Sequence, residues 1–200
     1  MKMNTYLYPV AACWLVFIAY WAVTAVGAKK NVGGPAFRRR LYFRAILVLA
    51  VLVIAHFSGD WHLTRHGGAS EGYDVSNGFF ANALVRSIGV ALCALGVGLS
   101  IWARTILGRN WGMPMSMKEN PELVTSGPYS RIRHPIYTGV LVALLGTSFA
   151  INAMLLIPLV LFSAYFIYSA MTEERSMTRQ FPDSYPEYMR RTNMLVPFLI

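Results

Sequence analysis

Residues 123–139 contain two arginines, a histidine and two tyrosines directly before an apolar run. Arg133 and His134 precede Pro135, which suits the first turn of a helix because that turn has no partner for its N–H group. A helix that begins there points backbone N–H groups and a partial positive charge at whatever lies in front of it. The stretch therefore predicts a seat for an anionic group.

A second group of polar side chains follows the last long apolar run and includes Glu173, Glu174 and Tyr188. Two carboxylates beside a basic, aromatic helix start would hold a zwitterionic ligand. Its anionic part would face Arg133 and His134, and its cation or hydroxyl groups would face the glutamates. Where the reacting group is a protonated amine, Glu174 or a tyrosine is the candidate base.

The composition indicates that these groups are positioned by a membrane protein. Hydrophobic residues make up 56% of the chain and charged residues 14%, and the mean hydropathy is +0.44. Several apolar runs approach the roughly 20 residues that cross a bilayer. The net charge of +9 would suggest nucleic acid in a soluble chain, but its place in the loops fits a membrane surface of anionic lipid better. We therefore expect the lipid bilayer, and no nucleic acid, as partner.

The apolar runs predict an all-α, polytopic bundle of about five transmembrane helices. We expect one membrane domain, 1–200, with a three-span part at 1–102 and a cofactor-binding catalytic part at 103–200. The predicted spans are 9–27, 41–57, 79–102, 135–150 and 153–171. Cys13 and Cys93 lie inside these runs and read as small buried hydrophobes, neither a disulfide nor a metal site.

The last two predicted spans must be antiparallel neighbours, because the connection at Asn152 is very short. This helical hairpin returns Glu173 and Glu174 to the membrane face that carries His134. Pro158 either kinks the last span or marks its true beginning.

Three glycines of the third predicted span, Gly89, Gly96 and Gly98, are small enough to let it approach a neighbouring helix closely.

The distribution of lysine and arginine predicts the orientation. Loops 28–44 and 103–134 and the C-terminal tail carry six, five and four basic residues, whereas the opposite side has only Lys2 and Arg65. By the positive-inside rule the first set is cytoplasmic and the N-terminus lies outside. The polar groups would then face the cytoplasm in a multi-pass membrane protein.

The C-terminal half, about residues 100–198, resembles the integral-membrane methyltransferases of the isoprenylcysteine carboxyl methyltransferase and phospholipid methyltransferase group. The matching residues are Trp102, Leu107–Trp111, Leu123, Val124, Gly127–Tyr129, Arg133–Pro135, Tyr137, Gly139, Glu173, Glu174, Phe181, Tyr185, Tyr188 and Leu195–Pro197. The Arg-His-Pro-x-Tyr-x-Gly element joined to a distant Glu-Glu is the specific part of the pattern.

The resemblance implies S-adenosylmethionine as cofactor, and from the residues we expect no metal. It implies a set of cofactor-binding residues: Leu123, Val124, Tyr129, Arg133, His134, Tyr137, Gly139 and Glu173. The catalytic residues it implies are Glu174, Arg133 and Tyr188. The chain has no Gly-x-Gly-x-x-Gly after a strand, so the soluble Rossmann way of binding a nucleotide is absent from the sequence. A polar donor from the cytosol and a lipophilic or prenylated acceptor from the bilayer could both reach a site at the interface.

The acceptor stays open, because the chain departs from the prenylcysteine-methylating pattern in two places. No arginine occurs at 168–172, before the acidic pair, and Phe181 is followed by Pro182 instead of glycine. The alternatives are a phospholipid, amine or thiol methyltransferase, a non-catalytic lipid-binding protein, and a reductase of the related sterol-reductase architecture that binds NADPH.

Asp60, His62 and His66 offer two histidines at i,i+4 spacing with a nearby carboxylate, which is conceivable as a zinc site. They lie in a glycine-rich segment on the opposite face, and we interpret them as an ordinary exposed loop.

Overall fold

The protein is seen here as a computed structural model that describes residues 5–25, 79–111 and 122–195. The predicted span 41–57, the predicted loop 28–44 and the loop with Asp60, His62 and His66 lie outside these residues. The described part is all-α, as predicted. Its α-helices are α1 (Leu7–Ala25), α3 (Ala83–Leu107), α4 (Pro135–Ala150), α5 (Leu156–Gln180) and α6 (Ser184–Arg191).

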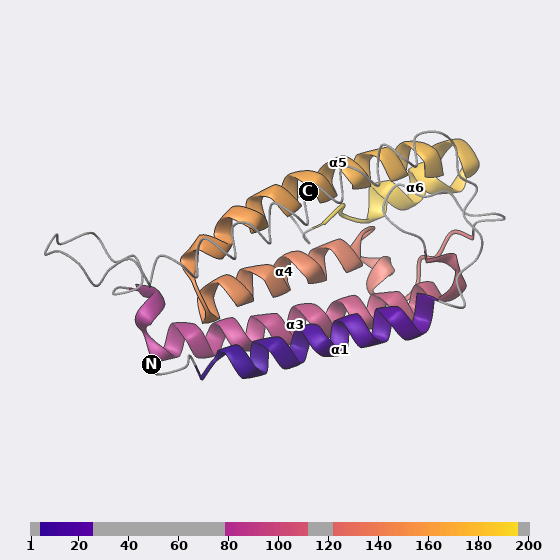
Figure 1. The fold of residues 1–200 in the computed structure, drawn as a ribbon. Coiled ribbons are helices and arrows are strands. Elements are labelled where there is room, and N and C mark those ends of the chain that lie inside the picture. The colour runs from indigo at the N-terminus through magenta and orange to yellow at the C-terminus, as the bar shows by residue number, and fades with distance from the viewer. Residues whose placement is uncertain (1–4, 26–78, 112–121, 196–200) are drawn as a thin grey trace, which may run out of the picture.

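The long helices lie side by side in layers. Figure 1 shows α1 along α3, α4 between α3 and α5, and α6 beside the C-terminal end of α5. Within residues 5–25, 79–111 and 122–195, three helical segments are long and apolar enough to cross a membrane, Leu7–Thr24, Ala83–Leu107 and Ala153–Gln180, and α4 is a shorter apolar helix. The chain is therefore a membrane helical bundle.

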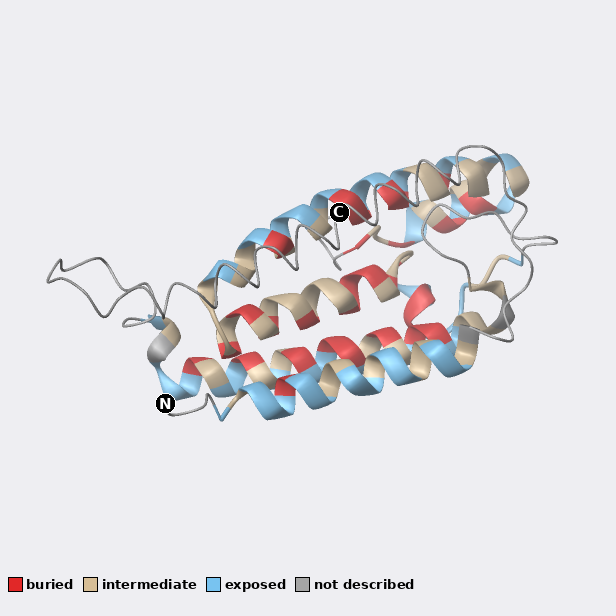
Figure 2. Cartoon of the chain, viewed as in Figure 1, coloured by how far each residue is buried: buried red, intermediate tan, exposed pale blue. Residues whose placement is uncertain are grey.

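The outward faces of α1 and α5 are apolar and exposed (Figure 2). On α1, Leu15 is 66% exposed and Val23 is 76% exposed, and on α5 Val160 is 66% exposed. In water such surfaces would be costly, whereas in a bilayer they face lipid tails.

Helix α3 is longer than predicted and ends at Leu107, not at 102. Asn82 caps its start by accepting a hydrogen bond from the Leu84 N–H at 2.8 Å. Its end is set by Gly108, whose φ of 53° suits glycine. Arg104 thus lies inside the helix and is 3% exposed, with its guanidinium donating to the backbone oxygens of Thr24 and Gly108.

Small residues hold α3 against α4. A Cβ atom added at Gly89 or Gly96 would clash with backbone atoms of α4, at Ala150 and Ala143 respectively. The prediction that these two glycines permit close approach is confirmed. It is wrong for Gly98, which has nothing within 4 Å of such a Cβ atom and so faces away from α4.

Helix α4 begins at Pro135 and is followed by a tight turn at Asn152, as predicted. The Asn152 side chain accepts a hydrogen bond from the Met154 N–H at 2.8 Å, which starts a short 3-10 helix, Ala153–Leu155. Pro158 lies in the first turn of α5, so it marks the beginning of that helix.

Helix α5 continues past Met171, the predicted end of the last span, and runs to Gln180. Glu173 and Glu174 are therefore interior residues of a helix, not its solvated end. Their carboxylates accept hydrogen bonds from Arg133 and Tyr137, which lie outside α5.

Candidate functional site

The C-terminal tail beyond α6, residues 192–195, runs alongside residues 131–134, which lead into α4. The Arg133 N–H donates to the Asn193 oxygen at 2.8 Å, and the His134 N–H donates to the Met194 oxygen at 3.1 Å. In return the Asn193 N–H donates to the Arg131 oxygen at 3.0 Å. This short parallel pairing fixes the backbone on which Arg133 and His134 stand.

Arg133 forms a buried ion pair with Glu174 of α5. The Nε atom lies 2.6 Å from Glu174 Oε1, and the two side chains are 9% and 8% exposed. Arg133 also donates to the backbone oxygens of Thr192 and, at 3.2 Å, Met189. These donations satisfy a guanidinium that would be costly to bury unpaired.

His134 lies between the two glutamates. Its Nδ1 atom is 3.5 Å from Glu173 Oε2, and its Nε2 atom is 3.3 Å from Glu174 Oε1. The Tyr137 hydroxyl donates to Glu173 Oε1 at 2.6 Å, and its ring stacks on the imidazole at a centroid distance of 5.4 Å. The prediction that the hairpin returns both glutamates to His134 is confirmed. We call Arg133, His134, Tyr137, Glu173 and Glu174 the polar cluster.

The polar cluster has an apolar neighbour on one side. Phe166 of α5 stacks on the Tyr137 ring at a centroid distance of 4.5 Å and is 7% exposed.

The two glutamates differ in solvent exposure. The Glu173 side chain is 25% exposed, whereas the Glu174 side chain is 8% exposed. A ligand would therefore reach Glu173 more easily than Glu174.

Tyr129 and Tyr188 form a second buried contact behind the tail. The Tyr188 hydroxyl donates to the Tyr129 backbone oxygen at 2.5 Å, and the side chains are 5% and 6% exposed. Burial, the largest cause, raises the pKa of Tyr188 to about 12 and raises the pKa of Tyr129 as well. Tyr188 is thus a neutral hydrogen-bond donor at physiological pH.

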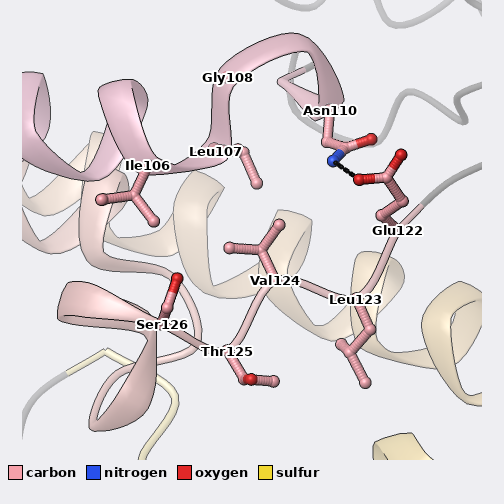
Figure 3. Close-up of a pocket in the computed structure, with 9 residues that line it drawn as sticks. All are labelled: Ile106, Leu107, Gly108, Asn110, Glu122, Leu123, Val124, Thr125 and Ser126. Carbon is pink, nitrogen blue, oxygen red and sulfur yellow. Dashed lines mark hydrogen bonds between the residues drawn. The ribbon is translucent and has the colours of Figure 1, made fainter.

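Leu123 and Val124 lie apart from the polar cluster, in the wall of an open cavity of about 610 Å³ (Figure 3). Its lining residues are Ile106, Leu107, Gly108, Asn110, Glu122, Leu123, Val124, Thr125 and Ser126. Asn110 donates to Glu122 Oε2 at 3.2 Å across the cavity's polar end, while the leucines, Ile106 and Val124 supply its apolar part. The volume suits a small molecule.

Gly139 faces α3 instead of the polar cluster. A Cβ atom there would clash with Ser100 Oγ and with backbone atoms of Gly96 and Ser100. Its position in the motif is thus explained by helix packing, while a contact with a cofactor stays a prediction.

The sequence reasoning missed the carbonyl groups of Met189 and Thr192 and the ring of Phe166. Backbone oxygens carry no residue-type signal, so no motif could have pointed to the first two. Phe166 precedes Glu173 by two helical turns, and that spacing places it on the same face of α5.

Chemically, the polar cluster brings two carboxylates and one arginine together in a largely buried position. Arg133 is committed to Glu174 and to the tail, so the second carboxylate, on Glu173, biases the cluster toward a ligand with a positive charge. The partial positive charge at the start of α4 suits the negative end of such a ligand.

The comparisons with known proteins identify the family of the chain. Residues 84–184, just over half of the chain, match the model of the family described as phospholipid methyltransferase. The match runs from α3 through the polar cluster to the start of α6.

Three curated relatives are similar to part of the chain. A cobalt-zinc-cadmium resistance protein of Cupriavidus metallidurans is 36% identical over 132 residues, which cover 64% of this chain and 56% of the relative. A nickel-cobalt-cadmium resistance protein of Alcaligenes xylosoxydans xylosoxydans is 32% identical, covering 55% and 53% of the two chains. A protein-S-isoprenylcysteine O-methyltransferase of Schizosaccharomyces pombe is 29% identical, covering 60% and 52%. The chain spans about half the length of the curated relatives it matches.

Proposed function

The chain belongs to the phospholipid methyltransferase family, and we propose that it transfers a methyl group from S-adenosylmethionine to a small lipophilic or prenylated acceptor. The observation that carries this proposal is the polar cluster. Arg133, His134 and Tyr137 come from the start of α4, and Glu173 and Glu174 come from the far end of the hairpin. Their meeting in one place is what the family's split motif requires.

The donor set of the polar cluster fits the charged end of S-adenosylmethionine. That end carries an ammonium, a carboxylate and a sulfonium, so it is zwitterionic with an extra positive charge. The Glu173 carboxylate, 25% exposed, suits the cation, and His134 with the start of α4 suits the carboxylate. We assign the adenosyl end to the cavity beside Leu123 and Val124, whose apolar wall suits a purine ring.

The cofactor, when bound, supplies an activated methyl group for an in-line displacement from sulfur. The residues of this chain contribute alignment and partial exclusion of water, which account for much of the barrier lowering in such a transfer. The stacked rings of His134, Tyr137 and Phe166 give the polar cluster a rigid wall for this purpose.

A protonated amine acceptor must first lose a proton, and the geometry favours Glu174 over Tyr188 as the base. The Tyr188 hydroxyl already donates to Tyr129, and its pKa of about 12 keeps it protonated at neutral pH. Glu174 lies inside the polar cluster, 3.3 Å from His134. We therefore propose Glu174 as base and Tyr188 as a positioning residue.

The site is proposed to face the cytoplasm, with the N-terminus outside. This rests on the fifteen basic residues of one side against two on the other. The cofactor would enter from the water phase and the acceptor from the bilayer.

The direct test is methyl transfer from labelled S-adenosylmethionine to lipid extracts, prenylcysteines, amines and thiols. We expect label in at least one lipophilic class with the purified protein, and less than a tenth of it with Glu174→Gln. A folded sample that binds no adenosyl ligand would instead favour a lipid-binding protein. Competition by NADPH would favour the reductase.

Two relatives are named for metal resistance, which is a phenotype that several different reactions could produce.

A further inference from the structure

One exposed stripe of α5 changes character along its length. Its exposed residues are apolar over most of the helix, at Ile157, Val160, Leu161, Ala164, Ile167, Tyr168 and Met171. The same stripe then continues with Arg175 and Arg179, both exposed and one helical turn apart. The buried face of the helix, with Phe166 and Glu174, points the other way (Figure 2).

The change from apolar to basic marks the depth at which α5 leaves the hydrocarbon. Tyr168 is 60% exposed and Met171 is 43% exposed, one turn before the first arginine. An exposed tyrosine followed by arginines is the arrangement that lipid–water interfaces favour. Arg175 and Arg179 therefore emerge at the level of the lipid headgroups.

Both arginines keep their charge available. No ion pair among the described residues involves Arg175 or Arg179. The nearest exposed acids in sequence are Asp183 and Glu187, and Glu187 lies 3.7 Å from Arg191 of its own helix. Two guanidinium groups at i,i+4 spacing can hold one phosphate between them.

We propose that Arg175 and Arg179 bind the phosphate of an anionic phospholipid headgroup and so hold this end of α5 at the membrane interface. The occupant is a lipid because the stripe is continuous with the apolar face of the same helix, which already faces the acyl chains. A soluble anion would use only the two charges. The site uses none of the side chains of the proposed methyl transfer, although Glu173 and Glu174 directly precede Arg175 on the same helix.

Lipid binding can be measured by native mass spectrometry of the detergent-purified protein with phosphatidylglycerol or phosphatidylcholine added at equal concentration. We expect more phosphatidylglycerol than phosphatidylcholine bound to the unaltered protein. The double variant Arg175→Gln/Arg179→Gln should weaken phosphatidylglycerol binding by about tenfold or more. Arg191→Gln, a paired arginine outside the stripe, should leave it unchanged.

Two outcomes would overturn the proposal. One is equal phosphatidylglycerol binding by the double variant and the unaltered protein. The other is full displacement of the lipid by inorganic phosphate at the same concentration, which would indicate a site for free anions. Because both arginines are exposed, the double variant should keep the thermal unfolding midpoint, and this control separates lost binding from lost folding.

Discussion

Helix α4 meets its neighbours in two opposite ways. Toward α3 it presents small residues, so that its backbone packs directly on the backbone of α3 at Gly89 and Gly96. Toward α5 and the residues after α6, the segment just before α4 carries Arg133 and His134, which meet carboxylates and carbonyl oxygens. The first contact depends on the absence of side-chain atoms, and the second depends on the pairing of opposite charges.

The difference shows how a polar site can be made rigid inside a membrane bundle. Close helix packing gives α4 one position against α3, and Ser100 of α3 donates to the Ile136 oxygen in the first turn of α4, at 3.3 Å. The polar cluster then forms on a helix start that is already fixed. Its charges add specificity to a position that the small residues determine.

The largest expected effect comes from breaking the buried ion pair. Glu174→Ala leaves the Arg133 guanidinium buried beside a cavity and should lower the free energy of unfolding by about 3 to 5 kcal/mol. The double variant Arg133→Met/Glu174→Leu should lose less, because it leaves no unpaired charge. Unfolding in detergent by denaturant titration measures both, and equal losses would show that the pair is not coupled.

A smaller effect is expected at the helix interface. Gly96→Ala places a methyl group against the backbone of α4 and should cost about 2 kcal/mol of unfolding free energy. Gly98→Ala is the matched control, because its Cβ atom meets open space and alanine favours a helix by up to about 1 kcal/mol. The two thermal midpoints should therefore move in opposite directions. Equal shifts would contradict the packing account.

Removing one hydroxyl group should lower the free energy of unfolding by a still smaller amount. Tyr188→Phe removes the donor to the Tyr129 oxygen and should cost about 1 kcal/mol. Since folding raises the pKa of Tyr188 from 10.0 to about 12, the unfolded chain releases this proton first as pH rises. The stability from Tyr188 is complete below pH 10 and is lost as pH approaches 12.

The check is the unfolding midpoint between pH 9 and 12. The decline with pH should be shallower in Tyr188→Phe than in the unaltered protein, while Tyr129 and Tyr185, whose pKa values burial also raises, keep part of it.

The smallest effect is expected for the exposed ion pair of α6. Arg191 and Glu187 lie 3.7 Å apart with side chains 69% and 60% exposed. Glu187→Gln should change the unfolding free energy by less than about 0.5 kcal/mol, and added salt should erase even that. If Glu187→Gln lowered the free energy of unfolding as much as Glu174→Ala, buried and exposed ion pairs would contribute equally to stability, contrary to this expectation.

Local patterns were enough to predict much of the fold. Pro135 followed by an apolar run located the start of α4, and the short connection at Asn152 predicted the hairpin that joins Glu173 and Glu174 to His134. The ends of α3 and α5 were missed, because polar residues that continue a helix look like the start of a loop. Arg104 is the example within α3, where its bonds to Thr24 and Gly108 make burial acceptable.

The partners of the site were less predictable than its members. The Arg133 contacts with Thr192 and Met189 join residues 59 and 56 positions apart, and backbone oxygens supply the acceptors. Nothing in the type or spacing of residues indicates such a contact.

The roles of Gly96 and Gly98 also look identical in sequence. They differ only in the side of α3 on which each glycine lies, toward α4 or away from it.

In the proposed reaction, the polar cluster binds the charged end of S-adenosylmethionine. Calorimetry with S-adenosylhomocysteine on the detergent-purified protein tests it most directly. We predict binding to the unaltered protein, a loss of at least tenfold, about 1.4 kcal/mol, in His134→Ala and in Glu173→Ala, and no change in Glu187→Ala. Unchanged affinity in both cluster variants, with both still folded, would contradict the account.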